Sequence, residues 1–275
     1  MTYASVLTHV AEDDECAERL RLAIDLAAAF GSELIGIGAE APELYLSPAG
    51  ISWPRPGYRL ADAGHEIAAR LERLAGVFEA TPGIDRVAHR WLARIADPAA
   101  FVSANARGAD LIVASRPSRA TSAREYALPA ELALAAGRPV LVAPKGPCAP
   151  RFEKIMVGWK DTREARRALL DALPLLRRAA NVIVAAVPEA DDRRETETAL
   201  EDVVRRLALL GVSADRALID RAGQDAFAAF AGLVEREAPD LLVIGAYGHS
   251  RLRELVLGGF THALMRDSRA LIFSH

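Results

Sequence analysis

The sequence predicts an α/β protein built from two tandem domains, each with a five-stranded and mostly parallel sheet. Short apolar runs without alternation recur along the chain, and such runs are typical of strands that are buried on both faces. They alternate with segments that place apolar residues at helical spacing. The second half then repeats the order of the first, which indicates two copies of one structural unit.

The first half alternates strands and helices in one series. We predict strands at 3–10, 33–39, 86–94, 110–114 and 138–144, and helices at 15–30, 60–80, 97–107 and 127–136. Gly31 and Gly137 end two of these helices, and Asp97 followed by Pro98 is a typical helix start. The strand at 86–94 alternates apolar and polar residues, which favours a place near the edge of the sheet.

A long segment at 41–58 interrupts the first half. It contains six helix- and strand-breaking residues: Pro42, Pro48, Gly50, Pro54, Pro56 and Gly57. This composition predicts a loop without regular structure. Long loops serve as lids over a site or as variable surface, and both interpretations stay open here.

The second half repeats the series. We predict strands at 154–158, 181–187, 217–220, 240–244 and 270–274, and helices at 163–178, 196–210, 225–237 and from the residues after 248 to about 266. The run 109–116 matches the run 239–246, including the aspartate that begins the predicted strand in each. We therefore expect one domain at 1–147 and another at 151–275, joined by a linker around 145–150.

A glycine pattern follows the strand at 240–244. Gly245, Gly248 and Gly258 are spaced as G-x2-G-x9-G, where backbone N–H groups can approach an anion. With its two repeated halves, the chain resembles the universal stress protein family in its tandem form. The resemblance implies a Rossmann-like, adenine nucleotide alpha hydrolase-like fold with strand order 3-2-1-4-5 and helices on both faces. It also implies ATP, or another adenine nucleotide, between the end of the first strand and the loop after the fourth.

The resemblance gives a set of nucleotide-binding candidates in the second half. They are Gly158, Lys160, Val187, Ile244, Gly245, Gly248, His249, Arg251, Gly258, Gly259 and Phe260. Gly259 stands where the family motif has Ser or Thr, and Lys160 stands where it has an aspartate. The first change removes a hydroxyl donor and the second removes a carboxylate that would hold the ribose or adenine. Asp161 could replace that carboxylate, or Asp161 and Thr162 could simply cap the next helix.

The first half departs further from the family pattern. Its loop at 114–121 has no glycine, and Ala11 stands at the position of the strand-one aspartate. We therefore predict that the first domain has lost its nucleotide site.

Composition excludes several classes of function. The net charge of -3 and pI near 6.1 give no global reason to expect nucleic-acid or membrane binding. No apolar run is long enough to cross a bilayer, and the amino-terminal residues lack a secretory pattern, so a cytoplasmic protein is expected. Cys16 and Cys148 have no metal-ligand spacing, and we expect no metal beyond Mg²⁺ that accompanies a nucleotide.

Three functions remain on sequence grounds. The first is a stress-response protein that binds ATP without catalysing its turnover, or at most hydrolyses it slowly. The second is a nucleotide-free protein-interaction module of the same fold, and the third is a nucleotide-using α/β enzyme. The strands near 138–144 and 270–274 would each leave an open sheet edge, so we expect them to pair in an intramolecular pseudo-dimer that leaves room for a homodimer.

Overall fold

The computed structural model describes residues 2–42, 45–46, 52–53, 60–116, 125–146, 152–189, 192–246 and 269–275. They form two compact units, one made by Tyr3–Ala136 and the other mainly by Gly137–His275. Each unit is an α/β structure with an open, mostly parallel sheet, as the sequence predicts. The predicted domain linker falls largely on residues 147–150, which lie outside the described residues.

The first unit contains a parallel sheet of order β6-β1-β2-β5. Its elements are β1 (Ser5–His9), α1 (Cys16–Phe30), β2 (Glu33–Glu40), β3 (Tyr45–Leu46), β4 (Ser52–Trp53), α2 (Leu60–Glu79), the 3-10 turn Ile84–Arg86, β5 (His89–Ile95), α3 (Pro98–Asn105), the 3-10 turn Ala106–Gly108, β6 (Leu111–Ala114) and α4 (Pro129–Ala135). The order places the predicted edge strand, β5, at the edge.

The second unit has the sheet order β10-β9-β8-β11-β12-β7. Its elements are β7 (Val140–Val142), β8 (Lys154–Gly158), α5 (Arg163–Asp171), α6 (Leu173–Leu176), β9 (Asn181–Ala186), α7 (Arg193–Leu209), β10 (Asp215–Leu218), α8 (Ala226–Glu237), β11 (Leu241–Gly245) and β12 (Ala270–Ser274). The strands from β10 to β12 are all parallel, so this unit has the strand order 3-2-1-4-5 that the resemblance implies.

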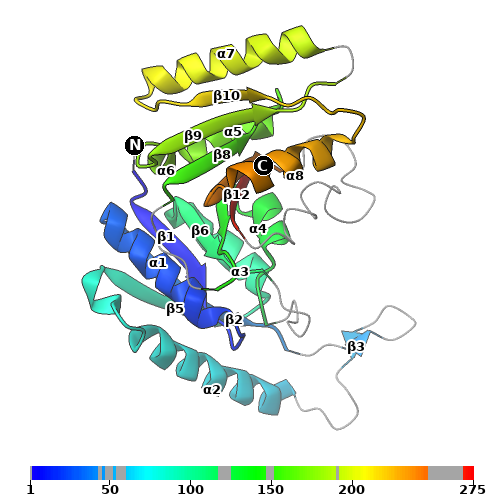
Figure 1. Ribbon diagram of the computed structural model, residues 1–275. Coiled ribbons are helices and arrows are strands. Elements are labelled where there is room, and N and C mark those ends of the chain that lie inside the picture. Colours follow the sequence, from blue (N-terminus) through cyan, green and yellow to red (C-terminus); the bar gives the residue numbers. More distant parts are fainter. Residues whose placement is uncertain are drawn as a thin grey trace. The chain divides into compact units, whose positions relative to one another are not determined.

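Helices pack on both faces of the sheet in the first unit. Figure 1 shows α1 and α2 on one face and α3 on the other. This arrangement follows from right-handed crossovers, because the chain first moves outward from β1 to β5 and then returns to β6. The carboxyl ends of all four parallel strands therefore lie along one edge of the sheet. Ligand sites of open α/β sheets form at such an edge.

One hydrogen-bond pattern occurs in both repeats. Asp110 precedes β6, and its Oδ2 accepts hydrogen bonds from the backbone N–H groups of Ala4 and Ser5 at 2.8 and 3.2 Å. Asp240 precedes β11, and its Oδ2 accepts from the N–H groups of Glu153 and Lys154 at 3.0 and 2.8 Å. The aspartate thus links the start of β6 to the start of β1 in the first unit, and the start of β11 to the start of β8 in the second.

The structure corrects two predictions of local structure. The segment predicted to lack regular structure contains the short antiparallel pair β3–β4, whose four residues avoid every proline of the loop. The helix predicted at 163–178 is divided into α5 and α6 at Ala172. Pro174 explains the division, because it has no N–H to continue the first helix but is well accommodated in the first turn of the second. The helix predicted to end near residue 266 lies outside the described residues.

The strand that closes the first half of the repeat has a partner. β7 pairs antiparallel with β12, with Leu141 opposite Ile272 and Val140 opposite Phe273. All residues of both strands are buried. The terminal strands of the two sequence repeats are therefore hydrogen-bonded to each other, while the pseudo-dimer and any homodimer built on this pairing stay predictions.

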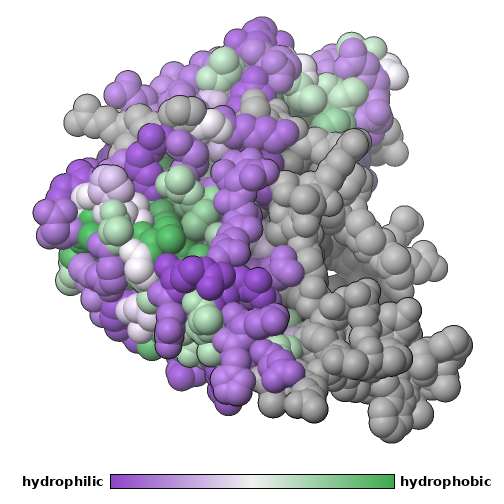
Figure 2. Space-filling view, turned by 90° about the horizontal axis from the view of Figure 1, so that it is seen from below, coloured by the Kyte–Doolittle hydropathy of each residue, from purple (hydrophilic) through white to green (hydrophobic). Residues whose placement is uncertain are grey.

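The described residues on the face in Figure 2 are mainly hydrophilic. Figure 2 shows one face on which polar residues surround a small hydrophobic area. The exposed large hydrophobic residues come from separate elements: Val77, Ile95, Leu134, Leu170 and Leu209. Scattered residues of this kind are normal on a folded protein. Among the described residues no helix combines the length and the apolar character that crossing a membrane requires.

The shared aspartate contact predicts a specific loss of stability. Asp110→Ala removes two charge-assisted hydrogen bonds at the start of β1, and we expect it to lower the free energy of unfolding of the first unit by about 1–2 kcal/mol. Urea titration measures the loss. Asp85→Ala, at an exposed position of the same unit, should change stability by less than about 0.5 kcal/mol. Equal effects of the two substitutions would show that Asp110 does not fix β1.

Candidate functional site

A cavity of about 570 Å³ lies in the second unit, at the carboxyl ends of β8, β9 and β11. This volume is within the range of small-molecule sites. The strand order reverses between β8 and β11, so the cavity is at the topological switch point where open α/β sheets bind ligands.

The described nucleotide-binding candidates from the sequence all line this cavity. They are Gly158, Lys160, Val187, Ile244 and Gly245. β8 ends at Gly158, β11 supplies Ile244 and Gly245, and Val187 follows β9 directly. The structure thus brings together residues from three strands that are far apart in the sequence. The other candidates, Gly248, His249, Arg251, Gly258, Gly259 and Phe260, lie outside the described residues.

Lys160 forms an ion pair at the cavity wall. Its Nζ lies 2.8 Å from Oε1 of Glu189, and both side chains are largely exposed, at 70% and 62%. The hydrogen bond from Lys160 holds the pKa of Glu189 below its usual value, so this carboxylate is ionised at neutral pH. The carboxylate of Glu189, in the segment after β9, therefore borders the cavity. The position after β8, where the family motif has an aspartate, is occupied by Lys160.

The residues after Lys160 form a helix start. Thr162 is the N-cap of α5, and its Oγ1 accepts a hydrogen bond from the N–H of Ala165 at 3.3 Å. Asp161 instead forms an ion pair with Arg166. The capping interpretation of this segment is confirmed for Thr162. Asp161 already has a cationic partner, and both members of that pair are more than half exposed.

Gly245 has a packing role of its own. A Cβ at this position would lie 2.4 Å from the backbone nitrogen of Ala165 and 2.6 Å from the carbonyl carbon of Glu164. The end of β11 therefore touches the first turn of α5, which leaves no room for a side chain. This contact explains the first glycine of the predicted motif without any ligand.

Acidic groups outnumber basic ones among the described residues that line the cavity. The acidic side chains are Asp161, Glu164, Glu189, Asp192 and Glu195, and the basic ones are Lys160 and Arg221. Asp192 and Glu195 lie at the start of α7, where the helix dipole favours negative charge. The described wall is thus better suited to neutral or donor-bearing groups of a ligand than to its phosphates.

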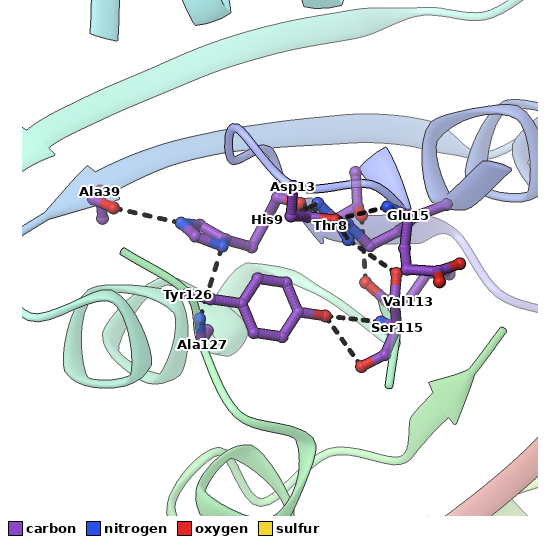
Figure 3. A network of polar contacts seen from close by, with 10 residues as sticks. Thr8, His9, Asp13, Glu15, Ala39, Val113, Ser115, Tyr126 and Ala127 are labelled. Carbon is purple, nitrogen blue, oxygen red and sulfur yellow. Dashed lines mark hydrogen bonds and ion pairs between the residues drawn. The ribbon is translucent and has the colours of Figure 1, made fainter. Parts of the chain in front are cut away.

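In the first unit, side chains fill the corresponding position at the carboxyl ends of β1 and β6 (Figure 3). Arg19 of α1 is fully buried and forms an ion pair with Asp13, with 2.7 Å between Nη2 and Oδ2. Its Nε donates to the carbonyl oxygen of His9 at 2.8 Å, and Nη1 donates to Oγ of Ser115 at 2.6 Å. Ser115 occupies the place in the repeat that Gly245 has in the second unit. Arg19 therefore connects the ends of β1 and β6.

Tyr126 and His9 complete this polar core. The hydroxyl of Tyr126 accepts from the N–H of Ser115 at 2.6 Å and donates to its carbonyl oxygen at 2.9 Å, while the guanidinium carbon of Arg19 lies 5.0 Å from the Tyr126 ring centroid. Burial, followed by the charge of Arg19, lowers the pKa of His9 to about 3. His9 is therefore neutral, and its ring nitrogens contact the carbonyl of Ala39 and the N–H of Ala127.

Comparison with solved structures identifies the architecture. The chain is similar to a universal stress protein from Archaeoglobus fulgidus DSM 4304, with a TM-score of 0.76, 13% identity and coverage of 98% of this chain and 95% of the other. The chain has the universal stress protein fold. A putative universal stress protein from Pseudomonas aeruginosa UCBPP-PA14 matches with a TM-score of 0.57 and 15% identity, over 99% of this chain and 93% of the other.

The chain is also similar to a functionally unknown protein from Pseudomonas aeruginosa PAO1, with a TM-score of 0.57, 14% identity and coverage of 99% of this chain and 92% of the other. No protein-family model matches the sequence, and no curated protein matches it. Identities this low establish the fold, and a fold hosts many functions. The cavity of the second unit is therefore the feature that indicates a function.

Sequence reasoning missed several residues of the cavity wall. Trp159, Glu189, Arg221 and Phe230 all line it. Trp159 directly follows β8 and directly precedes Lys160, so its place next to a family motif position was a usable signal. Arg221 and Phe230 come from the segment after β10 and from α8, and no local pattern connects them to the end of β8.

The contact at Gly245 predicts a large effect of one methyl group. Gly245→Ala places Cβ against the backbone of α5, and we expect a loss of about 3 kcal/mol in the free energy of unfolding. Gly232→Ala in α8 is the control, because a Cβ there meets nothing within 4 Å. That variant should gain about 0.5–1 kcal/mol from reduced backbone entropy. A Gly245→Ala variant that unfolds at the same urea concentration as the wild type would refute the close contact.

The buried histidine predicts a pH dependence of stability. The native state keeps His9 neutral, with a pKa of about 3, whereas the unfolded chain takes up a proton below about 6.5. Stability from this group is complete above pH 6.5 and decreases as the pH falls toward 3. Between pH 7 and pH 5 the expected loss is about 2 kcal/mol.

His9→Gln should reduce the loss of stability between pH 7 and pH 5, because glutamine does not titrate. Urea unfolding at pH 7 and pH 5, followed by tryptophan fluorescence, measures this loss of stability. Trp53 and Trp159 are replaced in the wild-type and variant proteins that are compared, so that Trp91 alone reports on the first unit. An unchanged difference between the two pH values in the variant would contradict the neutral, buried state of His9.

Proposed function

We propose that this chain is a tandem universal stress protein that binds an adenine nucleotide, without turning it over, in the cavity of its second unit. One observation carries the proposal. The five described candidates, chosen from sequence resemblance, line a single cavity at the switch point of the sheet. The proposed role is to sense stress: binding of the nucleotide changes the stability and the surface of the second unit.

The filled corner of the first unit supports a single site per chain. Arg19 is buried there between Asp13, His9 and Ser115, so a ligand would have to displace a hydrogen-bonded and ion-paired guanidinium. Removing one partner of such a buried ion pair costs about 3–5 kcal/mol. We therefore assign nucleotide binding to the second unit alone.

We expect the second unit to bind the nucleotide without turning it over. Within the described residues no group of three or more His, Cys, Asp or Glu side chains is arranged to hold a metal ion. The acidic residues of the wall stand at helix starts or in ion pairs instead. Hydrolysis needs a positioned water and a metal to neutralise the developing charge, so we expect any ATP hydrolysis to be slow.

A second candidate is an interaction module of the same fold that binds no nucleotide. Two observations favour it: Lys160 is already paired with Glu189, and Gly245 is explained by packing. Under this alternative the cavity has no nucleotide ligand, and the function resides in the surface or in the loop at 41–58.

A thermal-shift titration with ATP, ADP and AMP tests the proposal. A ligand that binds the native state stabilises it by about 2.7 kcal/mol at 100 times its Kd. We therefore expect the melting temperature to rise with the logarithm of nucleotide concentration for at least one of the three. No shift at millimolar concentrations of all three would favour the interaction module.

A blocked cavity provides the control. Ala199 of α7 lines the cavity, and Ala199→Phe should fill part of it and abolish the shift. The neighbouring Thr198 is exposed on the same helix and does not line the cavity, so Thr198→Phe should keep the shift. Loss of the shift in both variants, or in neither, would place nucleotide binding elsewhere.

A further inference from the structure

The edge strand of the second unit has backbone groups that no described strand uses. β10 is the last strand of the sheet, and its described strand partner is β9. The N–H of Ile219 donates to the carbonyl oxygen of Ala186 at 2.8 Å, so Ala217 and Ile219 direct their backbone groups toward β9. The backbone N–H and C=O groups of Arg216 and Leu218, which alternate with them, point away from the sheet. An edge of this kind can pair with a further strand.

A second cavity, of about 380 Å³, lies beside this edge. β10 contributes Ala217 and Leu218 to its wall, and α8 contributes Gly232, Leu233 and Arg236. Gly232 and Arg236 are exposed, so the cavity opens to the surface. The path of the chain turns back at β10, so α7 and α8 cover opposite faces of the sheet and the cavity lies on the α8 face.

The segment that forms one end of the cavity has no counterpart in the first repeat. Residues 219–225 separate β10 from α8, whereas only residues 96–97 separate β5 from α3. Asp220 and Arg221 of the longer segment line the cavity. Ala222 and Gly223 then turn the chain toward α8 with φ values of 46° and 82°, a left-handed conformation that alanine rarely adopts. The second repeat therefore adds this part of the wall to the common fold.

Gly232 leaves space in the cavity. A Cβ at this position would meet nothing within 4 Å, so the packing of α8 does not require a glycine there. Inside a helix, glycine is less favourable than alanine by about 1 kcal/mol. Any larger side chain at residue 232 would extend into the space that this residue lines. The glycine thus enlarges the cavity at a cost in helix stability.

The charge of the second cavity differs from that of the nucleotide cavity. Its described wall has two basic residues, Arg221 and Arg236, and one acidic residue, Asp220. Oδ1 of Asp220 already accepts a hydrogen bond from the N–H of Ala222 at 3.1 Å. Nε of Arg236 lies 3.7 Å from Glu237, whose carboxylate also pairs with Lys154 at 2.8 Å. The excess of positive charge favours an acidic group in this cavity.

We propose that β10 and the second cavity together form a docking groove, the edge groove, for an extended segment of a partner protein. The segment adds to β10 as a strand and places an acidic side chain in the cavity beside Arg236. In strand addition, backbone hydrogen bonds supply affinity and pockets for alternate side chains supply specificity. A strand beside β10 has every second side chain on the α8 face, where the cavity lies. The inference does not depend on nucleotide binding.

The first test is a selection from a phage-displayed library of random seven-residue peptides. The full chain is the bait, and the variant Gly232→Leu, in which the new side chain fills the cavity, is used for counter-selection. We expect the enriched peptides to be rich in β-branched residues and to carry Asp or Glu at one fixed position. No enrichment on the wild type beyond that on the variant, or enrichment without a fixed acidic position, would overturn the proposal.

Fluorescence polarisation with a labelled enriched peptide then measures the Kd. Gly232→Leu should bind it about tenfold more weakly. Gly76→Leu in α2 is the matched control and should bind it like the wild type, because a Cβ at either glycine meets nothing within 4 Å. Leucine also favours a helix more than glycine does, so both variants should fold.

A charge exchange tests the acidic contact. Arg236→Glu replaces attraction by repulsion and should weaken binding of the acidic peptide about tenfold. A peptide with lysine at the acidic position should bind Arg236→Glu more tightly than it binds the wild type, as coupled partners do. Equal Kd values of the two peptides for this variant would show that the acidic side chain does not lie beside Arg236.

Methylation of single peptide nitrogens tests strand addition. The N–H groups that face β10 alternate with those that face away, so methylation at every second position should weaken binding about tenfold and the intervening positions should tolerate it. Equal losses at neighbouring positions would overturn pairing with β10. Sedimentation of the chain alone provides a further test, because a dimer that Gly232→Leu dissociates would assign the edge groove to a second copy and overturn the partner protein.

Discussion

The end of β11 touches the backbone of α5 so closely that residue 245 cannot carry a side chain. This contact fixes the distance between the fourth strand of the repeat and the helix that follows the first strand. The space left beside it, toward β9 and α7, is the cavity. In the first unit Ser115 stands at the same place, and its hydroxyl binds the buried Arg19. One repeat therefore leaves an opening where the other builds a polar core.

This difference separates the two units. In the first unit the position at the strand ends is filled, because Arg19, Asp13, Ser115 and Tyr126 form a buried hydrogen-bonded network that also includes the carbonyl of His9. The second unit has a cavity at the corresponding position, and the exposed ion pair of Lys160 and Glu189 borders it. Under the proposed function, a ligand occupies this cavity.

Local signals in the sequence predicted most of the fold. Asp97 with Pro98 begins α3 as expected, because capping depends on neighbouring residues alone. The sequence also shows the repeat around Asp110 and Asp240. Both aspartates accept hydrogen bonds from the backbone at the start of the first strand, so the same residue occurs in each half. The β3–β4 pair was missed, because the four prolines of this segment are a strong local signal against strands, whereas the pair joins residues on either side of Pro48.

The candidate site was predicted less completely than the fold. Resemblance found Gly158, Lys160, Val187, Ile244 and Gly245, because these positions stand at strand ends that the repeat locates. It could not find Arg221 or Phe230, whose place at the cavity depends on how β10 and α8 pack beside β8. It also gave Gly245 a ligand-binding role, whereas the close contact with α5 supplies a sufficient physical reason for that glycine.

A crystal structure of the chain grown with AMP would test the central claim most directly. The account predicts electron density for the ligand in the cavity of the second unit alone, with the phosphate directed away from Glu189 and Asp192. A phosphate beside these two carboxylates, or a nucleotide in place of Arg19 in the first unit, would contradict it.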